Sequence, residues 1–433
     1  MEPQVSVIVP THNRAPRLGA ALEALSRQDW PAAALEAVIV ADGCTDQTAD
    51  VFARWNRPFR ARLVQQAASG PAAARNRGAA EARGRYLVFL DDDILASPGL
   101  VRAHVEAHSA GSRQVVIGYL PARVNNRDFF SIALRGWWDA MFQEMWKPGH
   151  RFTFRDLLSG NFSLEREFFE TAGGFETALR CHEDYELGLR LLEAGARFRF
   201  APRALGIHDE RTTLALSLKR KFEEGRADMW LLADRPRLFE VLPIRYIQAS
   251  SRRLRLLRWL AVRSPRAGDA LAWVLRQRLR WYERLRLRYR WRATLEDLLI
   301  YWYWRGLVVA AGGAPDLSAM RRRAAPDPAD EVVDIDLAGG VEAAELRLDR
   351  ERPAAVRLRH GASLIGEVPA AGAEYLRGVH LRLLLAEPFI ERYTRALAIA
   401  GELPPVVDVT RVLAECRPPE TPSLPTQQAG VPT

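Results

Sequence analysis

Hydrophobic and polar residues alternate in two patterns along the first half of the chain. Short, continuous apolar runs rich in β-branched residues have the pattern of strands buried on both faces, at 5–10, 36–42, 61–66 and 86–90. Segments with helical spacing or an Ala-rich composition separate them, at 15–28, 47–55 and 70–84. Strand–helix repeats of this length predict a doubly wound, mostly parallel α/β sheet with flanking helices and right-handed crossovers.

The pattern is less regular in the middle of the chain. It predicts a strand leading into a helix at 157–167, a helix at 184–194 and a strand at 197–208. Residues 213–311 have a mainly helical pattern with many Arg, Trp and Tyr. One stretch of this region, 284–292, alternates Arg with apolar residues, which is the spacing of a strand.

A Pro- and Asp-rich stretch at 321–331 indicates a linker to a third region. Beyond it, 332–366 has strand character and 373–400 has helical spacing, which together predict a small α+β module. The end of the chain, 413–433, is polar and Pro-rich and is predicted to be disordered.

Composition changes this picture because the positive charge is concentrated in one segment. A chain of 433 residues is too long for one core and predicts two or three domains. The formal net charge is +9, but residues 251–292 contain fourteen Arg and only two acids, Asp269 and Glu283. This segment therefore carries +12 and the remainder −3, so any anionic partner is expected to bind there.

Cysteine usage and hydropathy bear on the compartment. Cys44, Cys181 and Cys416 are odd in number and far apart, which predicts no disulfide framework or zinc site and fits a reducing compartment. The first residues lead directly into a strand without the pattern of a signal peptide, and no run of 18 uncharged apolar residues occurs. We therefore expect a cytoplasmic protein.

Acidic residues lie where the predicted strands end. Asp42 ends the second strand, the triplet 91–93 follows the fourth, and Glu183 and Asp184 precede a helix. In a doubly wound sheet, ligands bind beyond the carboxyl ends of the strands. Three adjacent carboxylates suit a divalent cation that neutralises a diphosphate, although a solvated acidic turn is the alternative for such a triplet taken alone.

Two common nucleotide motifs are absent from the sequence. No GxGxxG follows the first strand and no GxxxxGK[ST] occurs, which argues against a dinucleotide enzyme and a P-loop enzyme. A nucleotidyltransferase would need a basic triphosphate-binding loop near the first strand, where only Arg14 and Arg17 are available. The set of acids instead suits group transfer from a nucleoside-diphosphate donor.

Four motifs in order resemble one family. The sequences VSVIVPTHNRAPRLGAALEAL, VIVADGCTDQT, GPAAARNRGAAEARGRYLVFLDDDILASP and CHEDYELGLRLLEAG together resemble the family 2 inverting glycosyltransferases of the GT-A fold, as known from bacteria. The resemblance covers about 4–210, roughly half of the chain. It implies a GT-A catalytic domain, a nucleotide-sugar donor and a divalent metal, Mg²⁺ or Mn²⁺.

The resemblance also implies roles for individual residues on the donor side. Asp42 would hold the base of the nucleotide, Arg75 would approach the base or the phosphates, and Asp91 would lie near the ribose. The full set of implied donor contacts is Pro10, Thr11, Asn13, Asp42, Arg75, Asp91, Asp92, Gly160 and Asn161.

On the reacting side, the resemblance implies a metal site and a catalytic base. Asp93 would be the direct metal ligand, with Asp91 as the other acid of the D-x-D pair and His208 as a further contact to the metal or the diphosphate. Asp184 would take the proton from the acceptor hydroxyl, and Glu183 would help to place the acceptor. Taken alone, Glu183-Asp184 is also typical of a helix N-terminus, and a lone His such as His208 is often structural.

The basic segment 251–305 mixes Arg with Trp and Tyr, which suits the headgroup zone of an anionic membrane. The alternative is a helical subdomain that packs its aromatic residues inward and solvates its Arg. Nucleic acid is a third partner that Arg and aromatic residues can grip, but the sequence contains no recognised nucleic-acid module, which argues against that partner. A peripheral position on the inner face of the plasma membrane is therefore an open expectation beside the cytoplasmic one.

The sequence thus predicts a metal-dependent inverting glycosyltransferase acting on a cell-envelope polysaccharide, glycolipid or lipid-linked glycan, with a UDP- or GDP-sugar as donor. A polyprenyl-phosphate sugar transferase on the same fold and a non-catalytic membrane- or nucleic-acid-binding protein are the alternatives. The predicted organisation is a GT-A domain at 1–212, an Arg- and Trp-rich helical extension at 213–320, a small α+β module at 332–412 and a disordered tail at 413–433.

Overall fold

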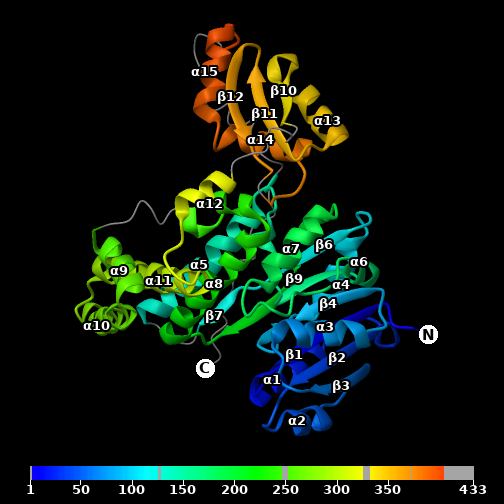
Figure 1. The fold of residues 1–433 in the computed structure, drawn as a ribbon. Coiled ribbons are helices and arrows are strands. Elements are labelled where there is room, and N and C mark those ends of the chain that lie inside the picture. The colour runs from blue at the N-terminus through cyan, green and yellow to red at the C-terminus, as the bar shows by residue number, and fades with distance from the viewer. Residues whose placement is uncertain (1, 125–127, 246–251, 325–331, 371, 404–433) are drawn as a thin grey trace. The chain divides into compact units, whose positions relative to one another are not determined.

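The structure is a computed structural model that describes residues 2–124, 128–245, 252–324, 332–370 and 372–403 (Figure 1). The predicted disordered tail and the end of the predicted C-terminal module lie outside the described residues. The strands are β1 (Val5–Thr11), β2 (Leu35–Asp42), β3 (Arg60–Gln66), β4 (Tyr86–Leu90), β5 (Ile94–Ala96), β6 (Gln114–Tyr119), β7 (Ala122–Val124), β8 (Asn161–Glu165), β9 (Arg197–Glu210), β10 (Val332–Asp336), β11 (Ala355–His360) and β12 (Ser363–Val368).

Helices separate most of these strands and dominate the middle of the chain. They are α1 (Ala15–Leu25), α2 (Thr48–Arg54), α3 (Pro71–Glu81), α4 (Leu100–His108), α5 (Phe129–Trp146), α6 (Arg166–Thr171), α7 (Glu183–Glu193), α8 (Leu214–Asp234), α9 (Arg252–Arg263), α10 (Pro265–Arg284), α11 (Arg288–Ala310), α12 (Leu317–Arg323), α13 (Val341–Glu351), α14 (Gly378–Ala386) and α15 (Ile390–Ala400).

The described residues group into two compact units. The first contains those of Met1–Met145, Phe152–Asp330 and Ala371–Glu374, and the second contains those of Trp146–Arg151, Glu331–Ala370 and Tyr375–Thr433. The predicted catalytic region and helical extension lie together in the first unit, and the boundary between them at residue 212 stays a prediction.

The first unit contains one large sheet with the strand order β3-β2-β1-β4-β8-β6-β9-β5, and β7 pairs with β9. The first four strands along the chain are parallel to one another, as their buried runs predict, and every residue of β1 and β2 is buried. β8 is antiparallel to both β4 and β6. The carboxyl ends of β1, β2 and β4 therefore meet at one edge, and the loop before β8 runs back to that edge.

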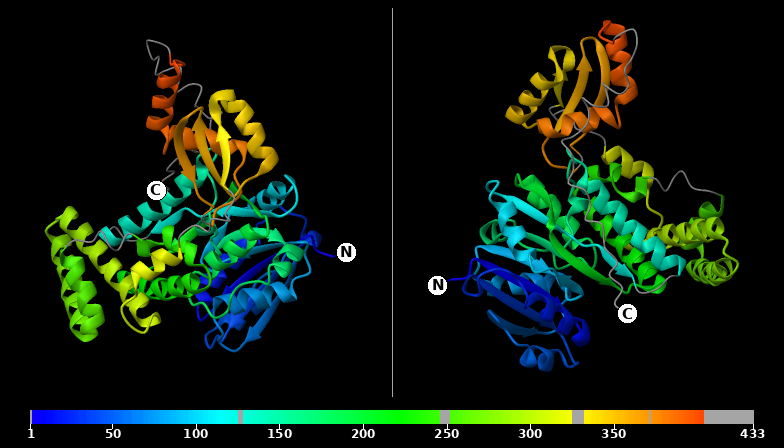
Figure 2. Two further views of the ribbon diagram at one scale, coloured as in Figure 1. Left: turned by 45° about the horizontal axis from the view of Figure 1, so that its top comes forward. Right: turned by 180° about the vertical axis from the view of Figure 1, so that it is seen from behind.

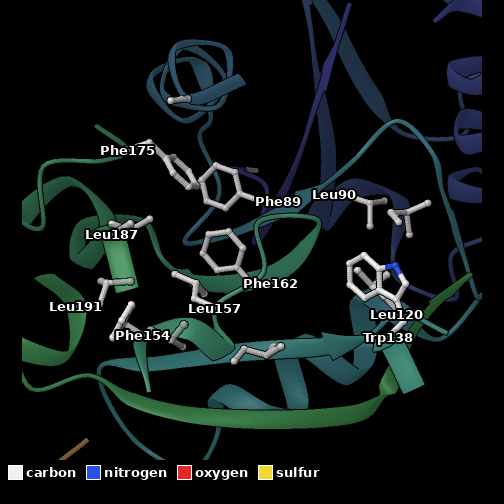
Figure 3. Packing of buried hydrophobic residues seen from close by; sticks show 14 of the residues in the cluster. Phe89, Leu90, Leu120, Trp138, Phe154, Leu157, Phe162, Phe175, Leu187 and Leu191 are labelled. Carbon is white, nitrogen blue, oxygen red and sulfur yellow. The ribbon is translucent and has the colours of Figure 1, made fainter. Parts of the chain in front are cut away.

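Aromatic side chains fill the core between β4, β8 and the helices that cover them (Figure 3). The Phe89 and Phe162 rings stack across the β4–β8 pair with centroids 4.8 Å apart, and Phe175 packs edge-on against Phe89 at 5.4 Å. Apolar residues of α7 close this core from the other side, including Leu187 and Leu191. The end of β4 and the start of α7 are thus anchored on the same packed cluster.

Within the extension, α8 and α11 pack against each other. At their crossing, a Cβ on Gly225 would lie 2.1 Å from the Tyr303 carbonyl oxygen, and a Cβ on Gly306 would lie 2.0 Å from the Phe222 carbonyl oxygen. Only glycine permits so close an approach of two helix backbones. The period-two pattern at 284–292 is not a strand, because α10 ends at Arg284 and α11 begins at Arg288.

The second unit has its own three-stranded sheet in the order β10-β11-β12, with α13, α14 and α15 contributing to its apolar core. β10 and β11 are parallel, and β11 and β12 are antiparallel. The strand character in 332–366 comes from VVDIDLAG and AAVRLRHGASLIGEV, which contain β10, β11 and β12, and α13 lies between these two stretches. This helix buries Ala344 and Leu348, four residues apart, which is the spacing of a helix face.

Candidate functional site

Three carboxylates follow β4, and each has its own partners. Asp92 is buried, accepts a hydrogen bond from the Thr11 hydroxyl at 2.7 Å and lies 3.0 Å from the Arg14 guanidinium. Burial raises the pKa of Asp92, while Arg14 and Thr11 act in the opposite direction. Asp92 therefore ties the end of β4 to the end of β1.

Asp91 is paired with a buried arginine of α3. The Arg75 guanidinium lies 2.7 Å from Asp91 Oδ1 and 3.0 Å from Glu183 Oε1. Burial disfavours ionisation of Asp91, but the Arg75 charge outweighs it and holds the pKa of Asp91 below its ordinary value. Burial and the neighbouring charge of Asp184 raise the pKa of Glu183. Arg75 thus joins the end of β4 to the start of α7.

Asp93 lies among basic residues without the close pairing of its neighbours. Its Oδ2 atom is 3.2 Å from Arg14 and 3.3 Å from Arg17, and its Oδ1 atom is 3.7 Å from His208 Nε2. Burial and the charge of Asp91 raise the pKa of Asp93 to about 6. A carboxylate whose ionisation is disfavoured in this way would be stabilised by a further cation.

The predicted metal ligands offer the donor atoms that Mg²⁺ and Mn²⁺ accept, two carboxylates and an imidazole. His208 Nδ1 is buried without a hydrogen bond and lies 3.9 Å from Glu210 Oε2, and Trp138 packs edge-on against the ring. One donor atom each from Asp91, Asp93 and His208 do not all lie within 4.8 Å of one another. Asp93 and His208 are thus the two predicted metal ligands that lie close together, and Asp91 is held by Arg75.

These groups face a cavity of about 630 Å³ at the carboxyl edge of the sheet. Of the residues predicted from the sequence, its lining includes Asn13, Asp91, Asp93, Gly160, Asp184 and His208. The other predicted residues, which are not among those that line it, are Pro10, Thr11, Asp42, Arg75, Asp92, Asn161 and Glu183. Several of these hold a lining residue in place, as Arg75 holds Asp91.

Asp184 reaches the cavity from the first turn of α7. Its Oδ1 atom accepts a hydrogen bond from the Tyr185 backbone N–H at 3.0 Å, and its Oδ2 atom accepts one from the Ser159 backbone N–H at 3.4 Å. The positive end of the helix dipole stabilises a carboxylate at this position. Asp184 is therefore both a residue of a helix N-terminus and a residue that lines the cavity.

Asp42 and Asn13 organise the loops at the ends of β2 and β1. The Asp42 carboxylate accepts hydrogen bonds from the Gln66 side chain and from the Ser69 and Gly70 backbone N–H groups, at 2.7–2.9 Å. Asn13 adopts a left-handed backbone with φ 51°, and its Oδ1 atom accepts a hydrogen bond from the Thr45 N–H at 2.8 Å. In the described structure both side chains are bound to protein groups, and their roles toward a nucleotide stay predictions.

Gly160 and Asn161 are adjacent in sequence but lie in different surroundings. A Cβ on Gly160 would approach Asp91 Oδ2 to 3.1 Å, so the absence of a side chain keeps this wall of the cavity open. The Asn161 side chain is fully buried, with its amide bound to His104 at 2.8 Å and to the Ala204 carbonyl at 2.9 Å. Its geometry is that of an interior residue of the sheet, so we assign the cavity contact at this strand to Gly160.

The helical extension holds the start of α7 through a buried network that the sequence analysis did not predict. His182 precedes α7 with φ 61°, and its Nδ1 atom lies 2.8 Å from the carboxylate of Asp228 on α8. The Tyr303 hydroxyl on α11 donates to the same carboxylate at 2.6 Å. Burial opposes protonation of His182, but Asp228 outweighs it and raises the pKa of the imidazole.

The lining also includes residues to which the sequence analysis assigned no role. Trp138 comes from α5, and Leu216 and Arg220 come from the first turns of α8. Arg14 and Arg17 lie one helical turn apart at the start of α1, a spacing that could have predicted a shared target. No local signal marks the others, because only tertiary packing brings α5 and α8 to the cavity.

Comparison with known proteins identifies the chain. The family model described as glycosyl transferase family 2 matches residues 6–173. The chain is 31% identical over 310 residues to validoxylamine A glucosyltransferase of Streptomyces hygroscopicus subsp. jinggangensis, a match that covers 62% of this chain and 72% of that protein. The chain belongs to glycosyltransferase family 2. It is an enzyme, and the GT-A fold predicted from its motifs is confirmed.

Other matches extend over similar parts of the chain. Glycosyltransferase AglE of Haloferax volcanii is 25% identical over 235 residues, covering 53% of this chain and 75% of that protein. Among solved structures, the mannosyltransferase PcManGT from Pyrobaculum calidifontis in complex with GDP-Man and Mn²⁺ is similar with a TM-score of 0.46 and 22% identity, covering 69% of this chain and 87% of that one.

Proposed function

We propose that this family 2 glycosyltransferase is metal-dependent and inverting, and that it transfers a sugar from a nucleoside-diphosphate sugar to an acceptor hydroxyl. One observation carries the proposal: Asp184 and the carboxylates of Asp91 and Asp93 face the same cavity, and Arg75 ties the two groups together through Glu183. A base and a cation-binding pair of carboxylates that face one cavity suit a single in-line displacement.

Asp184 acts as the general base in this proposal. The acceptor oxygen forms its bond to the anomeric carbon while the bond from that carbon to the diphosphate oxygen breaks, and Asp184 takes the acceptor proton. One displacement inverts the anomeric configuration and needs no covalent intermediate. The paired Glu183 lies beside Asp184, where it would position the acceptor.

The donor side would be formed by the strand ends. Asp93 and His208 would hold Mg²⁺ or Mn²⁺, with Asp91 beside them as the other acid of the pair, and the ion when bound would neutralise charge on the departing diphosphate. Pro10, Thr11 and Asn13 at the end of β1, Asp42 at the end of β2 and Gly160 before β8 are the proposed nucleotide-sugar contacts. Asp92 and Arg75 do not line the cavity, and in this proposal they hold the donor-side residues in place through their ion pairs.

A UDP- or GDP-sugar is the proposed donor, and a glycan or lipid-linked glycan is the proposed acceptor. The match to a protein named as a glucosyltransferase makes glucose the first sugar to test. The polyprenyl-phosphate alternative differs only in the acceptor, so assays with polyprenyl phosphate and with glycan acceptors distinguish the two. Family membership argues against the non-catalytic alternative.

The test combines nucleotide binding with two variants on the same helix. Calorimetric titration of UDP and GDP, with and without Mn²⁺, is expected to show metal-dependent binding of one nucleotide. Asp184→Asn is then expected to keep that binding within about twofold but to lower turnover about 10²–10⁴-fold, as removal of a general base does.

Glu193→Gln, at the exposed end of α7, is the matched control and should behave like the wild type. Turnover of Asp184→Asn within tenfold of the wild type would remove Asp184 as the base. Nucleotide binding that is unaffected by chelation would contradict the proposed metal dependence but not the proposed role of Asp184 as the base.

A further inference from the structure

α9, α10 and the first turn of α11 form a layer on the outer side of the extension (Figure 2). One face of each helix is buried: α9 buries Leu257 and Ala261, and α10 buries Ala272 and Leu279. The opposite faces and the start of α11 are exposed. We call the exposed side chains of residues 254–292 the hairpin surface.

The hairpin surface carries large apolar side chains at high exposure. Trp259, Trp273 and Trp281 are each about 60% exposed, and Tyr289 is 92% exposed. Large aliphatic residues accompany them on the same helices, namely Leu256, Val262, Val274 and Leu285. By contrast, Trp291, Tyr301, Tyr303 and Trp304 of α11 are buried, so the aromatic residues of the basic segment divide between core and surface.

The charge of the hairpin surface has one sign. The two acids of residues 254–292 are bound by other protein groups. Asp269 accepts a hydrogen bond from the Tyr301 hydroxyl at 2.5 Å and lies 3.6 Å from Arg305. Glu283 accepts a hydrogen bond from the Phe129 backbone N–H at 2.7 Å. The exposed charged residues of the described part of this segment are all arginine: Arg255, Arg263, Arg266, Arg278, Arg280, Arg284, Arg286, Arg288, Arg290 and Arg292.

We propose that the hairpin surface docks this enzyme on an anionic phospholipid bilayer. Trp and Tyr are the side chains that settle at the level of lipid headgroups, aliphatic side chains between them enter the acyl boundary, and Arg pairs with lipid phosphate. No described helix is both long and apolar enough to cross a bilayer. In this proposal the surface lies on the membrane, and the proposal does not depend on the catalytic chemistry.

Two other occupants fit the surface less well. A second copy of the chain would bring two arginine-rich faces together, which like-charge repulsion opposes. A nucleic acid would meet the arginines and stack on the tryptophans, but the exposed Leu256, Val262, Val274 and Leu285 have no stacking role against bases. Transfer of these aliphatic side chains from water into an apolar phase lowers the free energy, and a nucleic acid offers no such phase.

The test measures partitioning of the full chain onto vesicles by sedimentation. Wild type is expected to bind vesicles containing phosphatidylglycerol at low and physiological salt and to bind pure phosphatidylcholine vesicles far more weakly. Changing Arg278, Arg280, Arg284 and Arg286 to Gln together is expected to lower the partition coefficient about 100-fold or more. Trp259→Ser with Trp281→Ser is expected to lower it at least about tenfold while leaving the salt dependence in place.

Matched controls come from the second unit of the chain. Leu346→Ser and Ile399→Ser remove aliphatic side chains that are 72% and 70% exposed, and neither should change vesicle binding. Nucleotide binding by each variant confirms that the first unit is folded. The proposal is overturned if the wild-type protein does not bind anionic vesicles. It is also overturned if vesicle binding is unchanged in both the arginine and the tryptophan variants. Preferential binding to a single-stranded RNA over vesicles would assign the surface to nucleic acid instead.

Discussion

Arg75 is the residue whose removal tests the architecture of the site most directly. It is 5% exposed and pairs with Asp91 and Glu183, which belong to elements far apart in sequence. Replacement by Gln removes the charge while keeping an amide that can still donate hydrogen bonds. The variant leaves two neighbouring carboxylates without their shared cation.

The magnitude follows from the burial of the three groups. Removing one partner of a buried ion pair costs about 3–5 kcal/mol, because the remaining charge stays uncompensated. Asp91 is 34% exposed, so solvent screens part of that cost, and one retained hydrogen bond offsets about 1 kcal/mol. We therefore expect Arg75→Gln to lower the free energy of unfolding of the first unit by about 2–3 kcal/mol at pH 8.

The loss of stability in Arg75→Gln is expected to change with pH in a definite direction. Without Arg75, the folded-state pKa of Asp91 rises above its unfolded value of about 4, and the pKa of Glu183, which is already raised, rises further. Groups shifted in this direction stabilise the folded state below the unfolded pKa and lose that contribution as pH rises through the folded pKa. The difference in stability between wild type and variant should therefore be smaller at pH 5 than at pH 8.

Urea denaturation at both pH values measures this, with Arg77→Gln as the control on the same helix. Arg77 is 55% exposed and pairs with Glu81 one turn away, so its removal should cost at most about 0.5 kcal/mol. Equal effects of the two variants, or a difference that does not change with pH, would refute the description of Asp91, Arg75 and Glu183 as a buried charge network.

Two further predictions concern buried networks elsewhere in the first unit. Burial lowers the pKa of His104 to about 4 and of His108 to about 3, so the unfolded chain takes up protons first on acidification. Between pH 6.5 and 5, each of the two histidines should lower the free energy of unfolding by about 2 kcal/mol. In urea denaturation at the two pH values, His108→Gln should halve the total loss, and an unchanged loss would contradict this prediction. Tyr303→Phe, which removes a partner of Asp228, should lower kcat about tenfold with nucleotide affinity unchanged, whereas wild-type kcat would leave this network without influence on catalysis.

The half of the site on β1, β2 and β4 was predictable because its signals are local. Buried apolar runs define parallel strands, parallel strands end at one edge, and the acids that follow them must meet there. Asp91 and Asp93 after β4 and Asn13 after β1 line the cavity, whereas Asp42 at the end of β2 does not. Asn161 shows the limit of such motifs, since a polar residue next to a cavity residue turns out to be a buried link within the sheet.

The other half of the site was not predictable for a physical reason. Apolar residues occur on most sides of α5 in FFSIALRGWWDAMFQEMW, so no period marks the helix or singles out Trp138. Arg220 is one of many basic residues on α8, and nothing in its neighbours distinguishes it from a solvated charge. The hydrogen bonds from Asp228 to His182 and Tyr303 join three elements whose proximity depends on the packing of α8 against α11.

That packing shows that the extension helps to form the cavity and to hold the start of α7. α8 contributes Leu216 and Arg220 to the cavity that Asp184 also lines, and through Asp228 it holds His182, the residue that precedes α7. α11 supplies Tyr303 to the same carboxylate and is continuous in sequence with the hairpin surface. If the enzyme docks through that surface as we propose, α11 connects the docked face to the network that holds the start of α7. Within the proposed function, a lipid-linked acceptor is the one that such docking would favour over a freely diffusing glycan.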